Sequence, residues 1–172
     1  MVLLMSGALA PEAIADFLTA MYKKGETVTE IAAFSKVMRD FAPPIFPARR
    51  DAKKIVTIDP CGTGGGTVPT FNVSTVAAFV LAAAGLKVAK HGNRAITSRA
   101  GSADVFEALG IPLDLTPAEI GRLVKKVGIG FLFAPRFHTA TRFVQPVRKD
   151  LPHKTFFNIL GPLTNPAKPD YQ

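Results

Sequence analysis

Apolar side chains in the first part of the chain follow helical spacing. One helical face is made by Ile14, Phe17, Leu18 and Met21. Gly25 then acts as a stop signal, and a capping box of Thr27 and Glu30 opens a second helix that ends before a Pro-Pro pair. We therefore expect residues 1–47 to form a helical subdomain.

After residue 47 the pattern becomes β-rich. Residues 55–58 read Ile-Val-Thr-Ile, which predicts a buried strand that runs into an Asp-Pro pair and a glycine cluster. An alanine-rich helix follows, which Asn72 or Ser74 can cap, and residues 86–89 supply a second strand. Strand, loop, helix and strand in this order are typical of a βαβ unit.

Helices and strands continue to alternate further along the chain. Ser102 can open a helix that Gly110 closes, and Thr116 with Glu119 forms another capping box ahead of a helix. A third strand is expected at residues 129–133. A last helical face is made by Ala140, Phe143, Val144 and Val147.

These elements predict an α/β fold, with a small N-terminal helical subdomain followed by an α/β domain whose sheet is mainly parallel. The α/β domain would span residues 48–172. Within that range, residues 139–165 are candidates for packing with the helical subdomain.

Composition narrows the class of protein. The chain has 172 residues, 48% of them hydrophobic, which is enough to bury a real core. The single cysteine, Cys61, cannot form an internal disulfide, and residues 1–10 lack the pattern of a secretory signal, so a cytoplasmic location is expected. The longest apolar run, residues 76–85, is about half of what a membrane-spanning helix needs, which argues against a membrane protein.

Charge indicates an anionic partner without identifying it. Lysine and arginine number 21 against 13 acidic residues, a net charge of +8 that attracts polyanions. A phosphate-rich small ligand and a nucleic acid both fit this charge, and so does a solvated basic surface that has no partner.

A glycine-rich loop follows the first predicted strand. Residues 61–67 read Cys-Gly-Thr-Gly-Gly-Gly-Thr, and the glycines allow backbone N–H groups to approach a phosphate. The loop lacks the Gly-Lys-Ser/Thr ending of a nucleotide P-loop, and Thr67 occupies the place of the third glycine of a dinucleotide fingerprint. A simple tight turn is the alternative interpretation.

Two further segments have polar groups suited to an anion. Residues 72–75 place Asn, Ser and Thr at a helix start, where simple capping is the alternative. Residues 90–94, Lys-His-Gly-Asn-Arg, lie just past the second predicted strand, at the end where open α/β sheets bind ligands. Ser102 adds one more helix start, so we expect these loops to converge on one crevice.

Five motifs in one order make the sequence similar to a known family. They are Gly-Thr-Gly-Gly, Asn-Val-Ser-Thr, Lys-His-Gly-Asn-Arg, Gly-Ser-Ala-Asp and Leu-Gly-Pro-Leu-Thr-Asn-Pro. The chain resembles the anthranilate phosphoribosyltransferases from its first helix to Gln172. By this resemblance the α/β domain is incomplete in this chain, which would be the front part of the enzyme.

The resemblance implies a set of binding residues. Phosphoribosyl pyrophosphate (PRPP) would be held by Gly62, Gly65, Gly66, Thr70, Asn72, Val73, Ser74, Thr75, Lys90, His91, Gly92, Asn93, Arg94, Ala95, Ile96, Thr97, Ser98 and Ser102. Anthranilate would meet Gly62, Asn93 and Arg148, with His91, Pro135 and His138 lining its approach. Ser74 would also bind Mg²⁺, and Arg148 suits a carboxylate because a guanidinium pairs with it bidentately.

The reaction implied is transfer of the phosphoribosyl group to the amine of anthranilate, giving N-(5-phosphoribosyl)anthranilate and pyrophosphate for tryptophan synthesis. No single catalytic residue is assigned, because an aniline-type amine is already neutral near pH 7 and the harder task is neutralising the leaving diphosphate. The family also implies a homodimer that contacts through the helical subdomain.

The sequence departs from the family in two places. Gly66 stands where family members usually have aspartate, which removes an acidic group beside the expected diphosphate and metal. The family's acidic pair for a second magnesium lies in a later segment, and Gln172 falls within a continuing pattern. We therefore expect either a truncated chain or a partner polypeptide that carries the C-terminal half.

Other interpretations stay open at this point. The charge and Gly66 also suit a relative of the same fold that binds nucleic acid without anthranilate activity, and a pyrimidine-nucleoside phosphorylase has a similar architecture. Cys61 is more typical of a small buried side chain than of a nucleophile. Phe156 and Phe157 could back the substrate pocket, although packing in the core is the commoner role.

Overall fold

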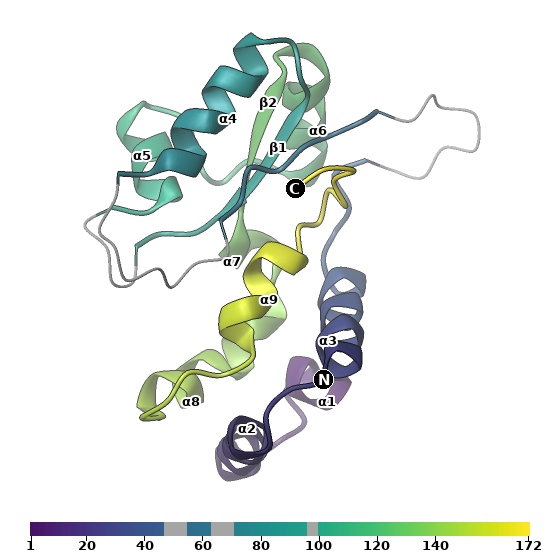
Figure 1. Ribbon diagram of the computed structural model, residues 1–172, viewed down its shortest axis with the longest axis vertical. Helices are drawn as coiled ribbons and strands as arrows, with labels where there is room; N and C mark the ends of the chain where they lie inside the picture. Colours follow the sequence, from purple (N-terminus) through teal and green to yellow (C-terminus); the bar gives the residue numbers. More distant parts are fainter. Residues whose placement is uncertain (47–54, 63–70, 96–99) are drawn as a thin grey trace. The chain divides into compact units, whose positions relative to one another are not determined.

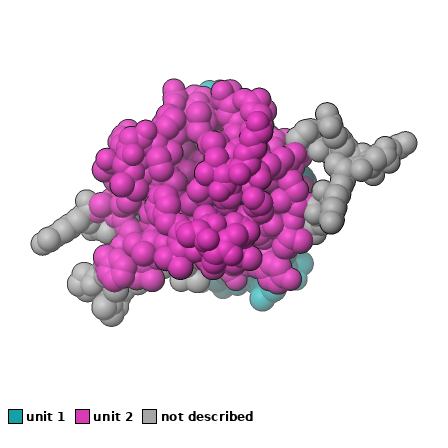
Figure 2. Space-filling view, turned by 90° about the horizontal axis from the view of Figure 1, so that it is seen from above, with its two compact units in different colours: residues 1–42, 138–164 teal, residues 43–137, 165–172 magenta. Residues whose placement is uncertain are grey.

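Two compact units make up the chain. The computed structural model describes residues 1–46, 55–62, 71–95 and 100–172. The helical unit combines residues 1–42 with 138–164, and the α/β unit combines residues 43–137 with 165–172; Figure 2 colours them separately. Within the described ranges, we find no helix with both the length and the apolar character needed to cross a membrane.

The helical unit is made of short and medium helices. They are α1 (Val2–Ser6), α2 (Pro11–Lys24), α3 (Val28–Asp40), the 3₁₀ helix η1 (Thr139–Phe143), α8 (Gln145–Asp150) and α9 (Phe157–Leu163). The expected capping box opens α3, because Thr27 Oγ1 accepts the Glu30 N–H at 3.3 Å and the Glu30 carboxylate accepts the Thr27 N–H at 2.9 Å. Gly25 ends α2 with a φ of +80°.

One apolar cluster holds this unit together. The buried side chains Ile14, Leu18 and Met21 come from the predicted face of α2, while Phe17 is 36% exposed. Phe156 lies at the centre of an aromatic group, with its ring centroid 4.6 Å from that of Phe34 and 4.7 Å from that of Phe157. Phe156 and Phe157 therefore belong to the core. All four methionines of the chain, Met1, Met5, Met21 and Met38, pack in the same cluster.

Parallel strands form the centre of the α/β unit. Strand β1 (Val88–Gly92) pairs with β2 (Ile129–Phe133), with Val88 opposite Ile129 and Gly92 opposite Phe133. The unit's helices are α4 (Val73–Ala83), α5 (Ser102–Ala108), α6 (Pro117–Lys126) and α7 (Ala134–Phe137). Figure 1 shows α4 next to β1 and α6 next to β2, and these pairs are in contact.

The two faces of this sheet have separate apolar clusters. Leu132 packs with Ile120 and Val124 of α6, whereas Phe131, the next residue along β2, packs with Phe106 of α5. Because alternate residues of a strand point to opposite faces, α6 covers one face and α5 the other. A helical unit followed by an α/β unit with parallel strands agrees with the predicted fold class.

Two strand predictions were wrong in extent. Residues 55–58 do not form a strand, because Ile58 alone makes isolated parallel bridges, to Val88 and to Tyr171. The second strand begins at Val88 rather than at residue 86 and continues through Lys90 and His91, which sequence reading had assigned to a loop. Both side chains are buried, and the two residues pair through their backbone with Phe131 and Leu132 of β2, so the strand extends further than its apolar pattern indicates.

Capping was predicted correctly for α6 and wrongly for α4. The carboxylate of Glu119 accepts the N–H of Thr116 at 2.8 Å, as the capping box requires. Asn72 makes no side-chain cap for α4, because its amide donates instead to the carbonyl of Gly101 at 3.3 Å. Ser102 is the first residue of α5, so it opens this helix as predicted.

The last predicted helical face, residues 140–147, is divided between η1 and α8. Pro146 lies in the first turn of α8, where its missing N–H and fixed φ favour a new helix start. The apolar spacing correctly marks a side that packs on the helical core through Ala140, Val144 and Val147, although two short elements divide it.

Candidate functional site

The carboxyl ends of β1 and β2 define the candidate site of the α/β unit. Asn93, Arg94 and Ala95 follow β1 directly, and Pro135 follows β2. The strands are parallel and in register, so these residues leave the sheet at the same edge. In open α/β sheets, ligands bind at this edge.

Asp59 is the centre of a buried polar cluster at this edge. Its side chain is fully buried, and Oδ1 accepts the backbone N–H of His91 at 3.2 Å. Oδ2 accepts the side-chain amide of Asn165 at 2.8 Å, and the same amide donates to the carbonyl of Ala89 at 2.8 Å. Burial raises the pKa of Asp59 to about 6, and hydrogen bonding from Asn165 and the charge of Lys90 oppose that rise.

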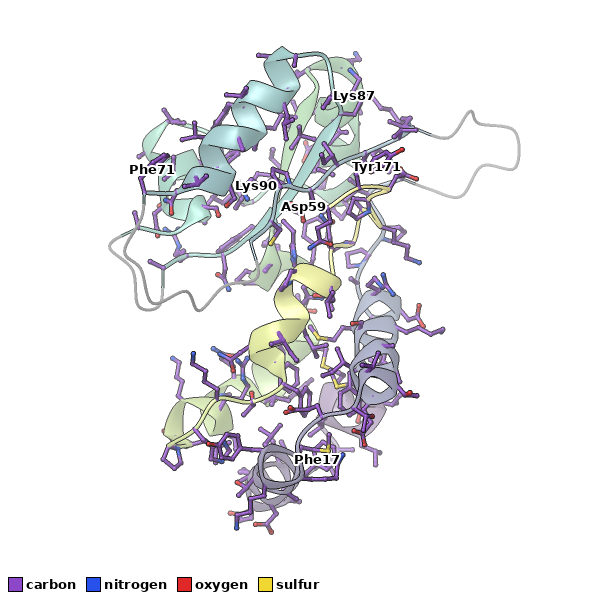
Figure 3. The ribbon with its side chains drawn as sticks, in the orientation of Figure 1. Phe17, Asp59, Phe71, Lys87, Lys90 and Tyr171 are labelled. Carbon is purple, nitrogen blue, oxygen red and sulfur yellow. The ribbon has the colours of Figure 1, made fainter. Side chains whose placement is uncertain are left out.

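Lys90 is the buried cation of the cluster. Its side chain is 1% exposed, and Figure 3 shows it beside Asp59. Burial lowers the pKa of Lys90, while the Asp59 charge favours the protonated ammonium. Burial also raises the pKa of Cys61 to about 11, so this thiol stays protonated at neutral pH and is a poor nucleophile.

Three segments meet just beyond the end of β1. Asn72, before α4, donates to the carbonyl of Gly101, and the N–H of Ala103 donates to the carbonyl of Asn93 at 3.2 Å. A Cβ built on Gly101 would lie 2.4 Å from the backbone nitrogen of Ala95, so only glycine fits there. The start of α4, the turn after β1 and the start of α5 are therefore in direct contact.

Arg94 of that turn is paired with acidic side chains. Its guanidinium donates to both carboxylate oxygens of Glu107, at 2.7 and 2.8 Å, and to Asp104 at 3.0 Å. These two residues were not singled out from the sequence as site residues, although Asp104 is part of the Gly-Ser-Ala-Asp motif.

The first turn of α4 contains several predicted PRPP residues. Thr75 is buried, and its hydroxyl has no hydrogen-bond partner among the described residues. Ser74 is half-buried beside it and Val73 is exposed. Hydroxyl and backbone N–H groups at the start of an 11-residue helix favour a bound anion.

Two predicted anthranilate residues belong to the helical unit. His138 is buried, and burial lowers the pKa of its imidazole to about 4, so the ring is neutral at pH 7. Arg148 lies in α8 with its guanidinium 4.9 Å from the ring centroid of Phe157. It donates to Gln145 at 3.1 Å, but its buried Nε has no hydrogen-bond partner, and no acidic side chain pairs with it, within the described part of the chain. Burial lowers the pKa of Arg148.

The structure brings some of the predicted residues together. Asn72, Asn93, Ala95 and Ser102 are gathered at the end of β1, and a Cβ built on Gly92 would lie 3.0 Å from that of Ser102. Gly62 is exposed at the end of a described segment. The predicted residues Gly65, Gly66, Thr70, Ile96, Thr97 and Ser98 lie outside the described residues.

A metal site is not formed by the described residues alone. They contain no group of three or more His, Cys, Asp or Glu side chains placed to hold an ion. The predicted magnesium ligand Ser74 offers a hydroxyl oxygen, which is a suitable single ligand for Mg²⁺.

Comparison with known proteins places the chain in a family. Residues 54–172 match the a/b domain of the glycosyl transferase family, and residues 1–42 match its helical bundle domain. The chain belongs to this family of glycosyl transferases.

Within it, the chain is similar to anthranilate phosphoribosyltransferases. That of Symbiobacterium thermophilum is 55% identical over 167 residues, which cover 97% of this chain and 48% of that protein. The Thermus thermophilus structure is 48% identical with a TM-score of 0.86, covering 99% of this chain and 50% of its own. The family resemblance read from the sequence is thereby confirmed.

A eukaryotic relative has been solved with ligands. The Saccharomyces cerevisiae anthranilate phosphoribosyltransferase in complex with PRPP and Mg is 35% identical with a TM-score of 0.79, covering 91% of this chain and 43% of that one. The yeast enzyme has also been solved with 4-fluoroanthranilate. The chain spans about half the length of the relatives it matches.

Proposed function

We propose that this chain supplies the N-terminal part of an anthranilate phosphoribosyltransferase, which transfers the phosphoribosyl group of PRPP to the amine of anthranilate. The proposal is supported by the family membership and by relatives whose structures hold PRPP with Mg or 4-fluoroanthranilate. Magnesium is the proposed cofactor.

The observation that carries the proposal is the contact between three turns at the end of β1. Asn72, Asn93 and Gly101 connect the start of α4, the turn after β1 and the start of α5. Each turn has backbone N–H groups or hydroxyls, and such groups bind phosphate oxygens without the steric bulk of long side chains. A sugar diphosphate offers several phosphate oxygens to groups arranged in this way.

The leaving diphosphate sets the chemical task of the site. The bond between the anomeric carbon and pyrophosphate breaks as the amine attacks, and the negative charge moves onto the diphosphate. Lys90, whose ammonium form is favoured by the charge of Asp59, and the polar groups of the gathered turns would stabilise that charge. Magnesium, when bound at Ser74 with further ligands, supplies additional charge neutralisation.

Arg148 is the proposed receptor of the anthranilate carboxylate. It differs from Arg94 because no described acidic side chain pairs with it and its buried Nε is unpartnered. A guanidinium in this state gains most from a planar carboxylate that accepts two parallel hydrogen bonds. Gly62, His91, Asn93, Pro135 and His138 remain proposed contacts for the aromatic ring.

The residues of the chain need not supply a strong base. The amine of an aniline is neutral near pH 7, so it can attack once it is held in line with the anomeric carbon. The neutral imidazole of His138 neither repels nor protonates such an amine. Positioning and charge stabilisation are therefore the work that this site performs.

Calorimetric titration with PRPP and Mg²⁺ tests the first part of the proposal. The protein used is the chain together with any residues encoded after Gln172. We expect saturable heat at submillimolar PRPP, followed by anthranilate-dependent release of pyrophosphate. No heat at millimolar PRPP contradicts the proposal, and so does salt-sensitive binding to DNA without turnover of anthranilate.

Assembly and location are further parts of the proposal. A homodimer that contacts through the helical unit, a cytoplasmic location, and domain boundaries at residues 1–47 and 48–172 follow from the sequence interpretation. Sedimentation equilibrium tests the dimer.

A further inference from the structure

Helix α5 presents two acidic side chains to Arg94. Glu107 binds the guanidinium through both of its carboxylate oxygens, at 2.7 and 2.8 Å, and Asp104 binds it through Oδ1 at 3.0 Å. The side chain of Arg94 also lies over the ring of Phe133, 5.8 Å from its centroid. Three independent contacts therefore fix one side chain of the turn that follows β1.

Asp104 also holds the backbone of that turn. Its second oxygen, Oδ2, accepts the N–H of Ala95 at 3.0 Å and the N–H of Gly101 at 2.7 Å. These two residues lie on either side of positions 96–99 in the sequence. One carboxylate thus joins the end of the segment after β1 to the start of α5 and bonds to Arg94 as well.

The charge arrangement shows what Arg94 can do. One guanidinium and two carboxylates carry a net charge of −1, so the group as a whole does not attract a phosphate. The pKa of Arg94 is raised by its hydrogen bonds to Glu107 and Asp104, and the pKa of Asp104 is lowered, mainly by its backbone hydrogen bonds from Ala95 and Gly101. The Arg94 guanidinium is therefore poorly suited to bind a phosphate, because Glu107 and Asp104 already balance its charge and accept its hydrogen bonds.

We propose that Asp104 and Glu107 are positioning residues for PRPP, which fix the turn after β1 through Arg94, Ala95 and Gly101, and that the Arg94 guanidinium is a structural contact rather than a phosphate ligand. This inference rests on the proposed function. It gives a role to two acidic side chains that lie beside the proposed PRPP site. Neither carboxylate would bind a phosphate directly, because like charges repel.

The test compares three single variants, Asp104→Asn, Glu107→Gln and Arg94→Gln, with a double variant that carries both Arg94→Gln and Glu107→Gln. The control is Glu119→Gln, which removes the corresponding carboxylate from the capping box of α6, away from this turn. Calorimetry measures the Kd for PRPP with Mg²⁺. Amide hydrogen exchange at Ala95 and Gly101 without ligand shows directly whether the backbone contacts are lost.

We expect Asp104→Asn to raise the Kd for PRPP about tenfold or more, because the Asp104 carboxylate binds both the backbone of the turn and the Arg94 guanidinium. Glu107→Gln should raise this Kd several-fold. The double variant should match the weaker-binding single variant, because residues that act as one unit are not additive. Glu119→Gln should stay within about twofold of wild type, since losing a cap affects the stability of its own helix. Exchange at Ala95 and Gly101 should become faster in Asp104→Asn alone.

A direct phosphate contact by Arg94 gives a different pattern. Glu107→Gln would then free the guanidinium and leave the Kd unchanged or lower, whereas Arg94→Gln would raise it. That result, or unchanged exchange in Asp104→Asn, overturns the inference while wild-type binding of PRPP keeps the proposed function. Failure of the wild-type protein to bind PRPP overturns both.

Discussion

The side-chain amide of Asn165 donates to the carboxylate of Asp59 at 2.8 Å, although 106 positions separate the two residues in the sequence. The same amide reaches the carbonyl of Ala89 in β1, and Asp59 accepts the N–H of His91 in the same strand. Three segments of the α/β unit are thereby fixed around Lys90. Asn165 belongs to the Leu-Gly-Pro-Leu-Thr-Asn-Pro motif, so one role of this motif is to hold Asp59 against β1.

We predict that Asp59→Asn destabilises the protein by about 1–3 kcal/mol at pH 7, the cost of unsatisfied buried groups. An amide at this position places a donor against the N–H of His91 or the amide of Asn165, and it removes the charge beside Lys90. Urea unfolding measures the difference. Asp114→Asn, an exposed position in the same unit, is the control and should change stability by less than about 0.5 kcal/mol.

The pH dependence of that difference has a definite sign. Burial raises the pKa of Asp59 to about 6 in the folded protein, so the folded state holds this proton more tightly than the unfolded chain does. The part of the stability that comes from holding this proton is complete below about pH 4 and is lost as the pH rises through about 6, whereas the hydrogen bonds that Asp59 accepts from His91 and Asn165 remain at pH 7. The gap between wild type and Asp59→Asn should therefore narrow from pH 4 to pH 6. A gap that widens over this window would show that Asp59 is ionised throughout it.

Arg148→Ala should weaken anthranilate binding far more than PRPP binding. The Nε atom, which has no partner among the described residues, and the stacking on Phe157 suit a planar carboxylate. Loss of a charge-assisted pair costs about 1.5–3 kcal/mol, or roughly tenfold to a hundredfold in affinity. Arg148→Lys should recover only part of this loss, because an ammonium cannot bind both oxygens in a fixed plane. Equal loss of both substrates would contradict the assignment; KM values for each substrate distinguish the outcomes.

Gly121→Ala should destabilise the α/β unit by about 1–3 kcal/mol, the cost of forcing extra volume into a packed site. Gly121 is buried in α6, and a Cβ there would lie 2.3 Å from the carbonyl oxygen of Ile45. Neither backbone can move without disturbing the sheet face that α6 covers. Arg122→Ala, the next and exposed residue of the helix, should be near neutral, and thermal unfolding of both variants tests the contrast.

His138 should titrate near pH 4 rather than near 6.5, because burial disfavours its charged form. The unfolded chain takes up that proton more readily, so the protein loses stability as the pH falls from about 6.5 toward 4. A His138→Gln variant should lack this part of the acid sensitivity. NMR titration of the imidazole Cε1–H gives the pKa directly, and a midpoint above 6 would contradict a buried neutral ring.

Structural features that depend on residues close together in the sequence were predictable. The capping boxes of Thr27 and Thr116 need only a residue three positions on, and the apolar run at residues 129–133 marks β2 correctly. The extent of β1 was not predictable in this way, because Lys90 and His91 interrupt its apolar pattern. They remain in the strand since distant groups, Asp59 and Asn165, supply charge and hydrogen bonds there.

In the candidate site too, features set by the local sequence were predictable and contacts between distant segments were not. The motifs predicted which segments form the site, and three of these segments do meet beyond β1. The pairing of Arg94 with Asp104 and Glu107 depends on how α5 packs against the turn, which no local spacing reveals. A count of basic residues therefore overstated the free positive charge of this loop. The binding roles of the predicted residues remain predictions.

The location of the methionines gives the protein a built-in set of probes. All four methionines pack in the core of the helical unit, and none belongs to the α/β unit. Selective ¹³C labelling of methionine methyl groups would therefore give an NMR spectrum that reports on one unit alone. A shift of these methyl resonances when PRPP is added would show that binding affects the helical unit, without interference from signals at the binding turns.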